Sequence, residues 1–306
     1  LAAASAGLAE AAVLSADLRR LDRAAIRRLV DAGVAVVGLT PDDQATQNRL
    51  RGLGVEQLLA DTSPVETVAA ALVAAVAARQ PAPPTGDPGR PRHHLEATSG
   101  GQVIAVWGPA GAPGRSTVAL NLAAELSALG NEVICIDLDT YGASLGQLAG
   151  LLDEGSGVAA ACRQANAGRL DEVSLRGLAA LVCPGLWLLT GVSSPQRWPE
   201  LRAAGLDVVL STAKAGYAYT VLDAGFCFEQ DDDLAYDTVA PCRNGATIAA
   251  LAAADVVVAV AASDPVGITR LVRAVAELPC QVTPITVVNR VRRGVVGRGD
   301  AFHQIG

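Results

Sequence analysis

The feature that most constrains the fold is a glycine-rich loop between an apolar strand and an apolar helix. The run VIAVW at Val103–Trp107 predicts a strand, and GPAGAPGRST at Gly108–Thr117 predicts the loop. In the helix that follows, apolar residues share one face: Val118, Leu122, Leu126 and Leu129. In such a strand, turn and helix, unpaired backbone N–H groups and the helix dipole can hold a phosphate. The sequence therefore predicts an anion-binding loop in an α/β fold.

The loop departs from the GxxxxGK[ST] phosphate-binding pattern at two positions. Gly114 is followed by Arg115 instead of Lys, and Pro109 stands where the pattern has its first Gly. Taken alone, the loop is interpreted equally well as a plain Gly/Pro turn before a helix. Ser116 and Thr117 carry hydroxyls of the type that bind Mg²⁺ and phosphate oxygen at a helix start.

Three aspartates follow apolar strands after the loop. Asp137 and Asp139 come after the predicted strand Val133–Ile136, and Asp223 ends the strand of YTVLDAG. One such aspartate is most often an ordinary strand-end residue. Three in this order indicate catalytic and metal-organising carboxylates, because parallel sheets place such groups at the carboxyl ends of their strands.

Two further apolar strands complete this part of the chain. Ala254–Val275 predicts a strand and then a helix, with Asp264 as the N-cap and Pro265 in the first helical position. Pro284–Arg290 predicts a strand that ends in Asn289. The alternation predicts an α/β fold, a parallel sheet with covering helices.

Residues 1–79 form a separate predicted domain. Short apolar strands alternate with helical segments there, and the Pro- and Gly-rich segment 80–100 predicts a linker to a second domain at 101–306. The segment from Ala35 to Val76 resembles the second half of a response-regulator receiver domain. Thr40 falls at the switch Thr/Ser of a receiver, and Asp61 replaces its lysine, so the resemblance implies a degenerate docking domain.

Residues 102 to about 292 resemble the MinD/ParA superfamily of deviant-Walker ATPases. That family has a KGGxGKTT loop, a strand ending in DxD, a Walker B aspartate, a further strand and helix, and a strand ending in Asn. With the receiver-like domain in front, the chain is similar to the CpaE/TadZ type and its actinobacterial septum-site relatives. The resemblance implies a P-loop NTPase-type parallel sheet with helices on both faces. It also implies ATP and Mg²⁺ as ligands, a nucleotide-dependent homodimer, and partner proteins of the division or pilus machinery.

The resemblance also implies roles for individual residues. Asp139 would orient the attacking water and Arg115 would be the catalytic cation, while Ser116, Asp137 and Asp223 would organise Mg²⁺.

For nucleotide binding, Asn289 would contact the adenine. The phosphate loop would consist of Gly111, Ala112, Gly114, Arg115, Ser116 and Thr117.

Lysine is nearly absent, and this bears on catalysis. The two functional lysines of the family fall on Ala110 and Arg115, and the single lysine of the chain is Lys214. An arginine neutralises phosphate but does not place its charge as an ammonium does. The resemblance thus implies an ATPase with an atypical Walker A loop and slow hydrolysis. Lys214 is a displaced phosphate ligand or, the favoured interpretation, a solvated helix-end lysine.

Composition limits the functions and cellular locations that this chain can have. The net charge of −7 excludes a surface built wholly for nucleic acid, because phosphate neutralisation needs clustered Lys and Arg. Six cysteines without a CxxC pair are predicted to be buried apolar residues in a reducing compartment. No segment predicts a transmembrane helix. The absence of Met and the ending soon after Asn289 indicate a piece of a longer protein, truncated at its C-terminus.

Two functions of different classes fit these observations. The first is a cytoplasmic ATP-dependent switch that positions a septum, a pilus machine or a chromosome, recruited to the inner face of the plasma membrane by partners or by a missing C-terminus. The second is a non-hydrolysing scaffold, favoured by Ala110 and Arg115 and opposed by the three aspartates. A synthetase that uses ATP to activate a carboxylate is a distant third. No feature of the sequence indicates direct binding to membrane or nucleic acid.

Overall fold

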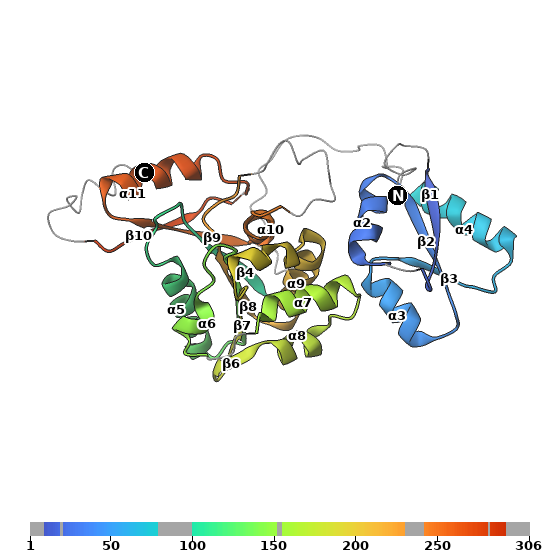
Figure 1. The fold of residues 1–306 in the computed structure, drawn as a ribbon, viewed down its shortest axis with the longest axis horizontal. Coiled ribbons are helices and arrows are strands. Elements are labelled where there is room, and N and C mark those ends of the chain that lie inside the picture. Colours follow the sequence, from blue (N-terminus) through green and yellow to red (C-terminus); the bar gives the residue numbers. More distant parts are fainter. Residues whose placement is uncertain are drawn as a thin grey trace. The chain divides into compact units, whose positions relative to one another are not determined.

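The computed structural model describes residues 9–18, 21–78, 100–151, 155–229, 242–280 and 282–291. By their internal contacts the residues divide into two compact units (Figure 1). The first contains the elements from β1 (Ala11–Ser15) to α4 (Val65–Ala78), together with residues 164–169. The second contains the rest of the chain from β4 (Gln102–Trp107) to β10 (Ile285–Asn289).

The first unit is a three-stranded parallel sheet with helices between its strands. The strand order is β1-β2-β3. Helices α2 and α3 begin after the N-caps Asp22 and Asp43, whose carboxylates accept backbone N–H bonds of the first turn. Its elements are β1 (Ala11–Ser15), α2 (Arg23–Asp31), β2 (Ala35–Thr40), α3 (Gln44–Gly52), β3 (Gln57–Ala60) and α4 (Val65–Ala78).

Apolar residues from the helices and loops form the core of this unit. Ile26 of α2 packs with Leu50, Leu53 and Val55, all of which are buried. Thr40 ends β2 and Asp61 follows β3, as the sequence predicts for a strand-and-helix alternation. The resemblance to a receiver domain stays a prediction.

The second unit contains a seven-stranded sheet in the order β10-β9-β4-β8-β5-β7-β6. Every described pairing is parallel except β6 with β7. The strands are β4 (Gln102–Trp107), β5 (Val133–Leu138), β6 (Ala180–Cys183), β7 (Leu186–Leu189), β8 (Tyr219–Ala224), β9 (Val256–Ala262) and β10 (Ile285–Asn289).

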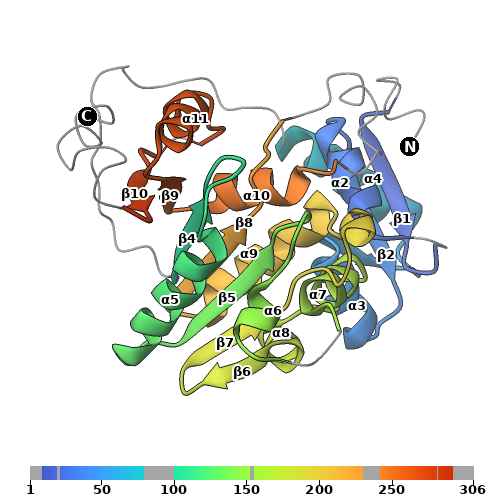
Figure 2. The same cartoon turned by 60° about the vertical axis from the view of Figure 1, so that its left-hand side comes forward.

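Helices cover both faces of this sheet, as the sequence predicts. Helix α5 lies on one face, and α9 and α10 lie on the other (Figure 2). The helical elements are α5 (Arg115–Ala128), α6 (Leu145–Leu148), α7 (Gly157–Asn166), α8 (Glu172–Leu178), η1 (Pro195–Glu200), α9 (Ala203–Gly216), α10 (Gly245–Ala253) and α11 (Pro265–Val275). The predicted α/β fold with a parallel sheet is confirmed, except that the edge strand β6 runs antiparallel to β7.

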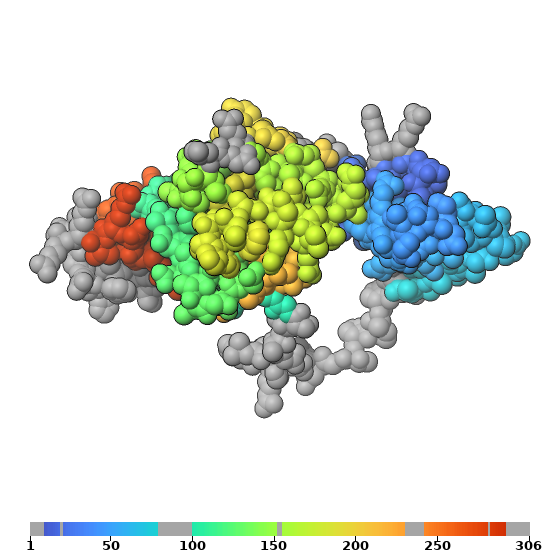
Figure 3. Space-filling view, turned by 90° about the horizontal axis from the view of Figure 1, so that it is seen from below, coloured from blue at the N-terminus to red at the C-terminus, as the bar shows by residue number. Residues whose placement is uncertain are grey.

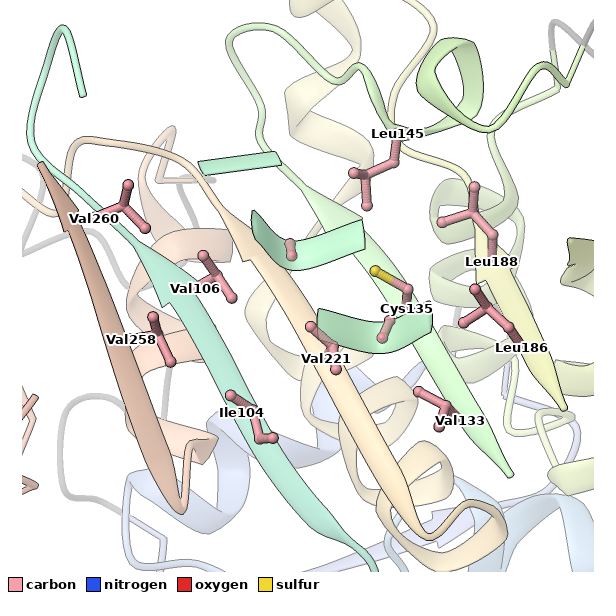
Figure 4. Close-up of a cluster of buried hydrophobic side chains, with 12 residues drawn as sticks. Ile104, Val106, Val133, Cys135, Leu145, Leu186, Leu188, Val221, Val258 and Val260 are labelled. Atoms are coloured by element: carbon pink, nitrogen blue, oxygen red, sulfur yellow. The ribbon is translucent and has the colours of Figure 1, made fainter. Parts of the chain in front are cut away.

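Alternate residues of five strands make the core under α5. Because side chains alternate between the faces of a strand, Ile104 and Val106 of β4 point to the same side as Cys135 of β5 and Val221 of β8 (Figure 4). The same alternation places Asp137 and Asp223 on this face, because they stand two residues after Cys135 and Val221.

The helix after the loop buries a different stripe from the one the sequence predicts. Ala119, Ala123 and Ser127 of α5 are buried, whereas Val118, Leu122 and Leu126 are only partly buried and pack at the edges of the core. Leu129 was predicted on the apolar face, and this is wrong, since it is 78% exposed. Small residues face the sheet because the helix lies close to it.

The prediction that the cysteines are buried holds only in part. Cys135 and Cys162 are buried, but Cys183 and Cys242 are exposed and the other two are half-buried. Cys183 lies on β6, the edge strand of the sheet. The β6–β7 hairpin and the neighbouring helix α8 are seen on the surface of this unit, coloured yellow-green (Figure 3). An edge strand has one unpaired side, which explains the exposure.

Candidate functional site

The loop between β4 and α5 has a backbone that depends on glycine. Gly111 and Gly114 have φ angles of 78° and 90°, in the left-handed region that side chains other than glycine rarely adopt. A Cβ at Gly108 would clash with the Val260 carbonyl of β9, and one at Gly114 would clash with the Asn289 amide. The glycines therefore allow both the turn and the close approach of neighbouring strands.

The first turn of α5 opens toward the same space. Gly114 is the N-cap residue and supplies no side-chain hydrogen bond, so the first backbone N–H groups of the helix have no capping acceptor. Ser116 and Thr117 lie in this turn, and Thr117 is exposed. An uncapped helix start of this kind binds anions through its N–H groups and its dipole.

Two aspartates lie side by side next to the helix start. Strand β5 extends past the predicted Ile136 to Leu138, because its parallel pairing with β8 continues through the register pair Asp137 and Asp223. Both side chains are buried. Burial raises the pKa of Asp137 to about 6, and burial together with the neighbouring Asp137 carboxylate raises the pKa of Asp223 to about 8.

Asp137 and Asp223 differ in the hydrogen bonds that their carboxylates accept. Asp137 Oδ2 accepts the Ser144 and Leu145 N–H groups at 2.9 and 3.0 Å, and its Oδ1 accepts the Asp139 N–H at 3.2 Å. Neither oxygen of Asp223 has a hydrogen-bond partner of normal geometry, although the Ser116 hydroxyl is close enough to lower the pKa of Asp223. Asp137 thus holds the loop after β5, whereas Asp223 is the carboxylate of the site whose oxygens lack hydrogen-bond partners.

Arg115 joins the glycine-rich loop to the loop after β5. Its Nη1 donates to the Gly108 carbonyl at 3.0 Å, and its Nη2 donates to Asp139 Oδ2 at 3.2 Å. Asp139 Oδ1 accepts the N–H groups of Tyr141 and Gly142. Both oxygens of Asp139 are therefore engaged by groups of the chain itself.

Asn289 contacts the loop directly. Its Nδ2 donates to the Pro113 carbonyl at 3.0 Å from the end of β10. The contact brings the residue predicted to meet adenine beside the glycine-rich loop. Of the predicted site residues, those of the loop, the three aspartates and Asn289 therefore gather at the carboxyl ends of β4, β8, β5 and β10.

Several contacts at the site are not evident from the sequence. Arg270 of α11 donates to the Ala110 carbonyl, and Arg243 lies 4.3 Å from the ring of Tyr141, whose hydroxyl donates to Asn244. These residues lie 100 or more positions from their partners, so no local pattern could have revealed them.

Lys214 is not at the site. Its Nζ donates to both carboxylate oxygens of Asp255 at 2.9 Å, and Asp255 also accepts the Val103 N–H at the amino end of β4. The lysine is therefore a paired helix-end residue, and the displaced phosphate ligand considered from the sequence is wrong.

The described residues contain no cluster of three or more His, Cys, Asp and Glu side chains that could hold a metal ion by themselves. A magnesium site here would therefore be one that phosphate and water complete, as Mg²⁺ sites in nucleotide-binding proteins commonly are. None of the helices in the described segments combines the length and apolar character needed to cross a membrane.

A cavity of about 610 Å³ adjoins the Asp137 side of the site, at the carboxyl ends of β5 and β7. Its lining includes Gln147, Thr190 and Ser193, and Asp137 is the only charged residue among the described ones that line it. Because the described residues that line it carry no positive charge, this cavity is distinct in chemistry from the glycine-rich loop.

Sequence comparison gives one family match. Residues 100–178 match the ParA family model, described as NUBPL iron-transfer P-loop NTPase. A search of curated protein sequences gives no match.

Solved structures share the fold of the second unit. A ParA family ATPase from Chlorobium tepidum is 17% identical, with a TM-score of 0.55 over 67% of this chain and 81% of that one. The septum site-determining protein MinD from Pyrococcus horikoshii, complexed with Mg-ADP, is 15% identical, with a TM-score of 0.51 over 66% and 76%. The cell division ATPase MinD from Pyrococcus furiosus is 17% identical, with a TM-score of 0.50 over 66% and 78%. The second unit therefore has the fold of MinD and ParA P-loop NTPases.

Proposed function

We propose that the second unit binds Mg-ATP at the glycine-rich loop and hydrolyses it slowly, as a nucleotide-dependent switch. The observation that carries this proposal is the buried Asp223 carboxylate, which lacks hydrogen-bond partners and lies beside the uncapped N-terminus of α5. A buried carboxylate without a partner costs free energy unless a ligand or a proton compensates it. A divalent cation and a phosphate supply both missing partners.

The residues present fit these ligands. Backbone N–H groups between Gly111 and Thr117 would hold the phosphates, and Asp223 with the Ser116 hydroxyl would hold Mg²⁺ and its water shell. Mg²⁺ would neutralise phosphate charge. Asp137 would act indirectly, because its oxygens already accept three N–H groups of the loop after β5.

The Arg115–Asp139 ion pair suggests how binding is coupled to hydrolysis. A phosphate in the loop competes with Asp139 for the Arg115 guanidinium, since an arginine fork can pair with phosphate oxygens as it does with carboxylate oxygens. When Arg115 turns to the phosphate, Asp139 Oδ2 is released. That oxygen can then accept a hydrogen bond from a water and orient it for attack.

The biological role belongs to the same proposal. Relatives of this fold are named for septum-site determination and cell division, and a ParA family ATPase shares it as well. We infer that this chain positions a septum, a pilus machine or a chromosome, as a nucleotide-dependent homodimer of the CpaE/TadZ type. The receiver-like unit would act as its docking domain for partner proteins.

The non-hydrolysing scaffold is a second candidate, and a specific observation favours it. Arg115 and Asp139 neutralise each other, and Ala110 stands where the family has its signature lysine. If phosphate does not separate the pair, the chain binds nucleotide without turning it over.

The test measures Mg-ATP binding by calorimetry and phosphate release for the wild type, Arg115→Ala and Asp139→Ala. We expect Arg115→Ala to weaken Mg-ATP binding by about tenfold or more, since a hydrogen bond to a charged group contributes about 1.5–3 kcal/mol. Asp139→Ala should bind Mg-ATP as tightly as the wild type or more tightly, because Arg115 is then free, and should release no phosphate.

Arg202→Ala serves as the control, because Arg202 is an exposed arginine at the start of α9. It should match the wild type in both measurements. A wild type with no measurable Mg-ATP affinity rejects the proposal. Binding with equal, negligible phosphate release in all variants selects the scaffold.

A further inference from the structure

The glycine-rich loop is short of positive charge for a polyphosphate ligand. The loop and the strand ends bring together three aspartates and one cation, Arg115, which already pairs with Asp139. Ala110 carries no charge at the tip of the loop, and Lys214 is paired with Asp255 at the amino end of β4. Mg²⁺ would offset part of the phosphate charge, and a further protein cation beside the loop would offset more of it.

Helix α11 brings such a cation to the loop from a distant part of the chain. Arg270 Nη1 donates to the Ala110 carbonyl at 3.0 Å. The same nitrogen lies 2.9 Å from the position that a Cβ would take at Gly111. The guanidinium therefore packs directly on the loop tip, in a space that the glycine leaves open.

The fold explains why Arg270 reaches this place. Strand β9 pairs with β4 in the sheet, so the turn after β9 lies beside the loop after β4. Asp264 caps α11 with a bond to the Gly267 N–H, and Pro265 occupies the first position, which fixes where the helix starts. Arg270 then falls in the second turn.

The contact leaves most of the guanidinium available. Arg270 is exposed, and among the described residues the Ala110 carbonyl is its only hydrogen-bond partner. A guanidinium carries five N–H donors, so four remain for other acceptors. Phosphate oxygens suit them, because a planar fork binds such oxygens in pairs.

We propose that Arg270 is a phosphate-contacting cation of this nucleotide site, supplied by α11 of the same chain beside the loop position that carries Ala110. The inference rests on the proposed function, since it assumes that the loop binds a nucleotide. It assigns the missing charge to a residue outside the loop and outside every strand end of the sheet.

The test titrates Mg-ATP into the wild type and into Arg270→Ala, Arg270→Gln and Arg270→Lys at two salt concentrations. Arg270→Ala should weaken Mg-ATP binding by about tenfold or more, by the size of a charge-assisted hydrogen bond. Arg270→Gln keeps a donor for the Ala110 carbonyl but no charge and should be as weak. Arg270→Lys should recover part of the affinity, and the salt dependence of binding should be smaller in the two uncharged variants.

Arg273→Ala is the matched control, because Arg273 is also an exposed arginine of α11. It should bind Mg-ATP as the wild type does. All variants should keep the melting temperature of the nucleotide-free wild type, which separates loss of a ligand contact from loss of loop structure.

The outcomes distinguish this inference from the proposed function. A wild type that binds Mg-ATP together with an Arg270→Ala variant of equal affinity overturns the role of Arg270 alone. If Arg270→Ala and Arg270→Lys lose affinity and Arg270→Gln does not, Arg270 tethers the loop instead of contacting phosphate. A loss of affinity that comes with a lower melting temperature has the same meaning. Either result overturns the role of Arg270. A wild type that fails to bind Mg-ATP overturns both.

Discussion

Asp137 and Asp223 are chemically identical side chains that pair in register on strands β5 and β8, but their surroundings differ. Three backbone N–H groups stabilise the charged form of Asp137, whereas Asp223 has no such partner and also feels the charge of Asp137. This explains why the pKa of Asp223 is raised further, to about 8, than that of Asp137, to about 6.

The raised pKa values predict a specific pH dependence of stability. Folding raises the pKa of both carboxyls above their ordinary 3.8, so the folded protein binds protons that the unfolded chain has lost. The free energy of unfolding of the ligand-free protein should therefore fall as pH rises from about 4 to about 8, by up to about 1.4 kcal/mol per pH unit for each proton. Asp137 contributes up to about pH 6, and Asp223 over the whole interval.

Asp223→Asn should reduce this dependence, because an amide does not titrate. Thermal or urea unfolding between pH 5 and 8, with a chelator present, measures the slope. Glu125→Gln, at an exposed position of α5, should keep the wild-type slope. An Asp223→Asn variant with the wild-type slope would mean that Asp223 is already ionised in the folded protein at pH 5.

At the scale of elements, the loop after β5 is tied to the start of α10. The Tyr141 hydroxyl donates to Asn244 Oδ1 at 2.8 Å, and the Arg243 guanidinium lies over the Tyr141 ring. Thr140 Oγ1 donates to the Arg243 carbonyl, and the rings of Tyr141 and Phe226 lie 4.7 Å apart. Asp139 belongs to the same loop, so these contacts help to fix the predicted catalytic carboxylate.

Tyr141→Phe should loosen this connection without removing the ring contacts. We expect a loss of about 1 kcal/mol in the free energy of unfolding and faster amide exchange in the first turn of α10, because one hydrogen bond is lost. Hydrogen-exchange mass spectrometry of peptides covering residues 242–253 measures the effect. Tyr219→Phe, at the start of β8, provides a control that should leave this exchange unchanged, and equal exchange in both variants would refute the connection.

The elements around the site were predictable because each depends on local sequence. The positions of β4, α5, β8, β9 and α11 follow from apolar runs, glycines and the Asp264–Pro265 helix start, and the structure has them within a few residues. The buried stripe of α5 was not predictable from the leucines, because the distance between helix and sheet decides whether alanine or leucine faces inward.

At the scale of the whole molecule, each unit has its own hydrophobic core. Ile26, Leu50 and Leu53 belong to the first, and the α5-covered cluster that includes Val106 and Val221 belongs to the second. A unit with its own core can fold alone when the core is large enough.

We therefore expect a chain of residues 100–306 to fold and to bind Mg-ATP with the affinity of the full chain. Circular dichroism melting and calorimetric titration of this fragment test the expectation. A fragment that melts without cooperativity, or that binds Mg-ATP more than tenfold more weakly, would show that the nucleotide site needs residues before Gly100.

The sequence by itself determined the elements and the candidate residues, because glycine spacing, apolar periodicity and strand-end carboxylates are local properties of the chain. Tertiary structure alone decided their hydrogen bonds and ion pairs. Asp137 accepts backbone hydrogen bonds whereas Asp223 has no partner, and Arg115 pairs with Asp139. Tertiary structure alone also brought Arg270 to the loop, across 160 residues. Such pairings depend on strand order and helix packing, which join distant segments, and no local pattern encodes them.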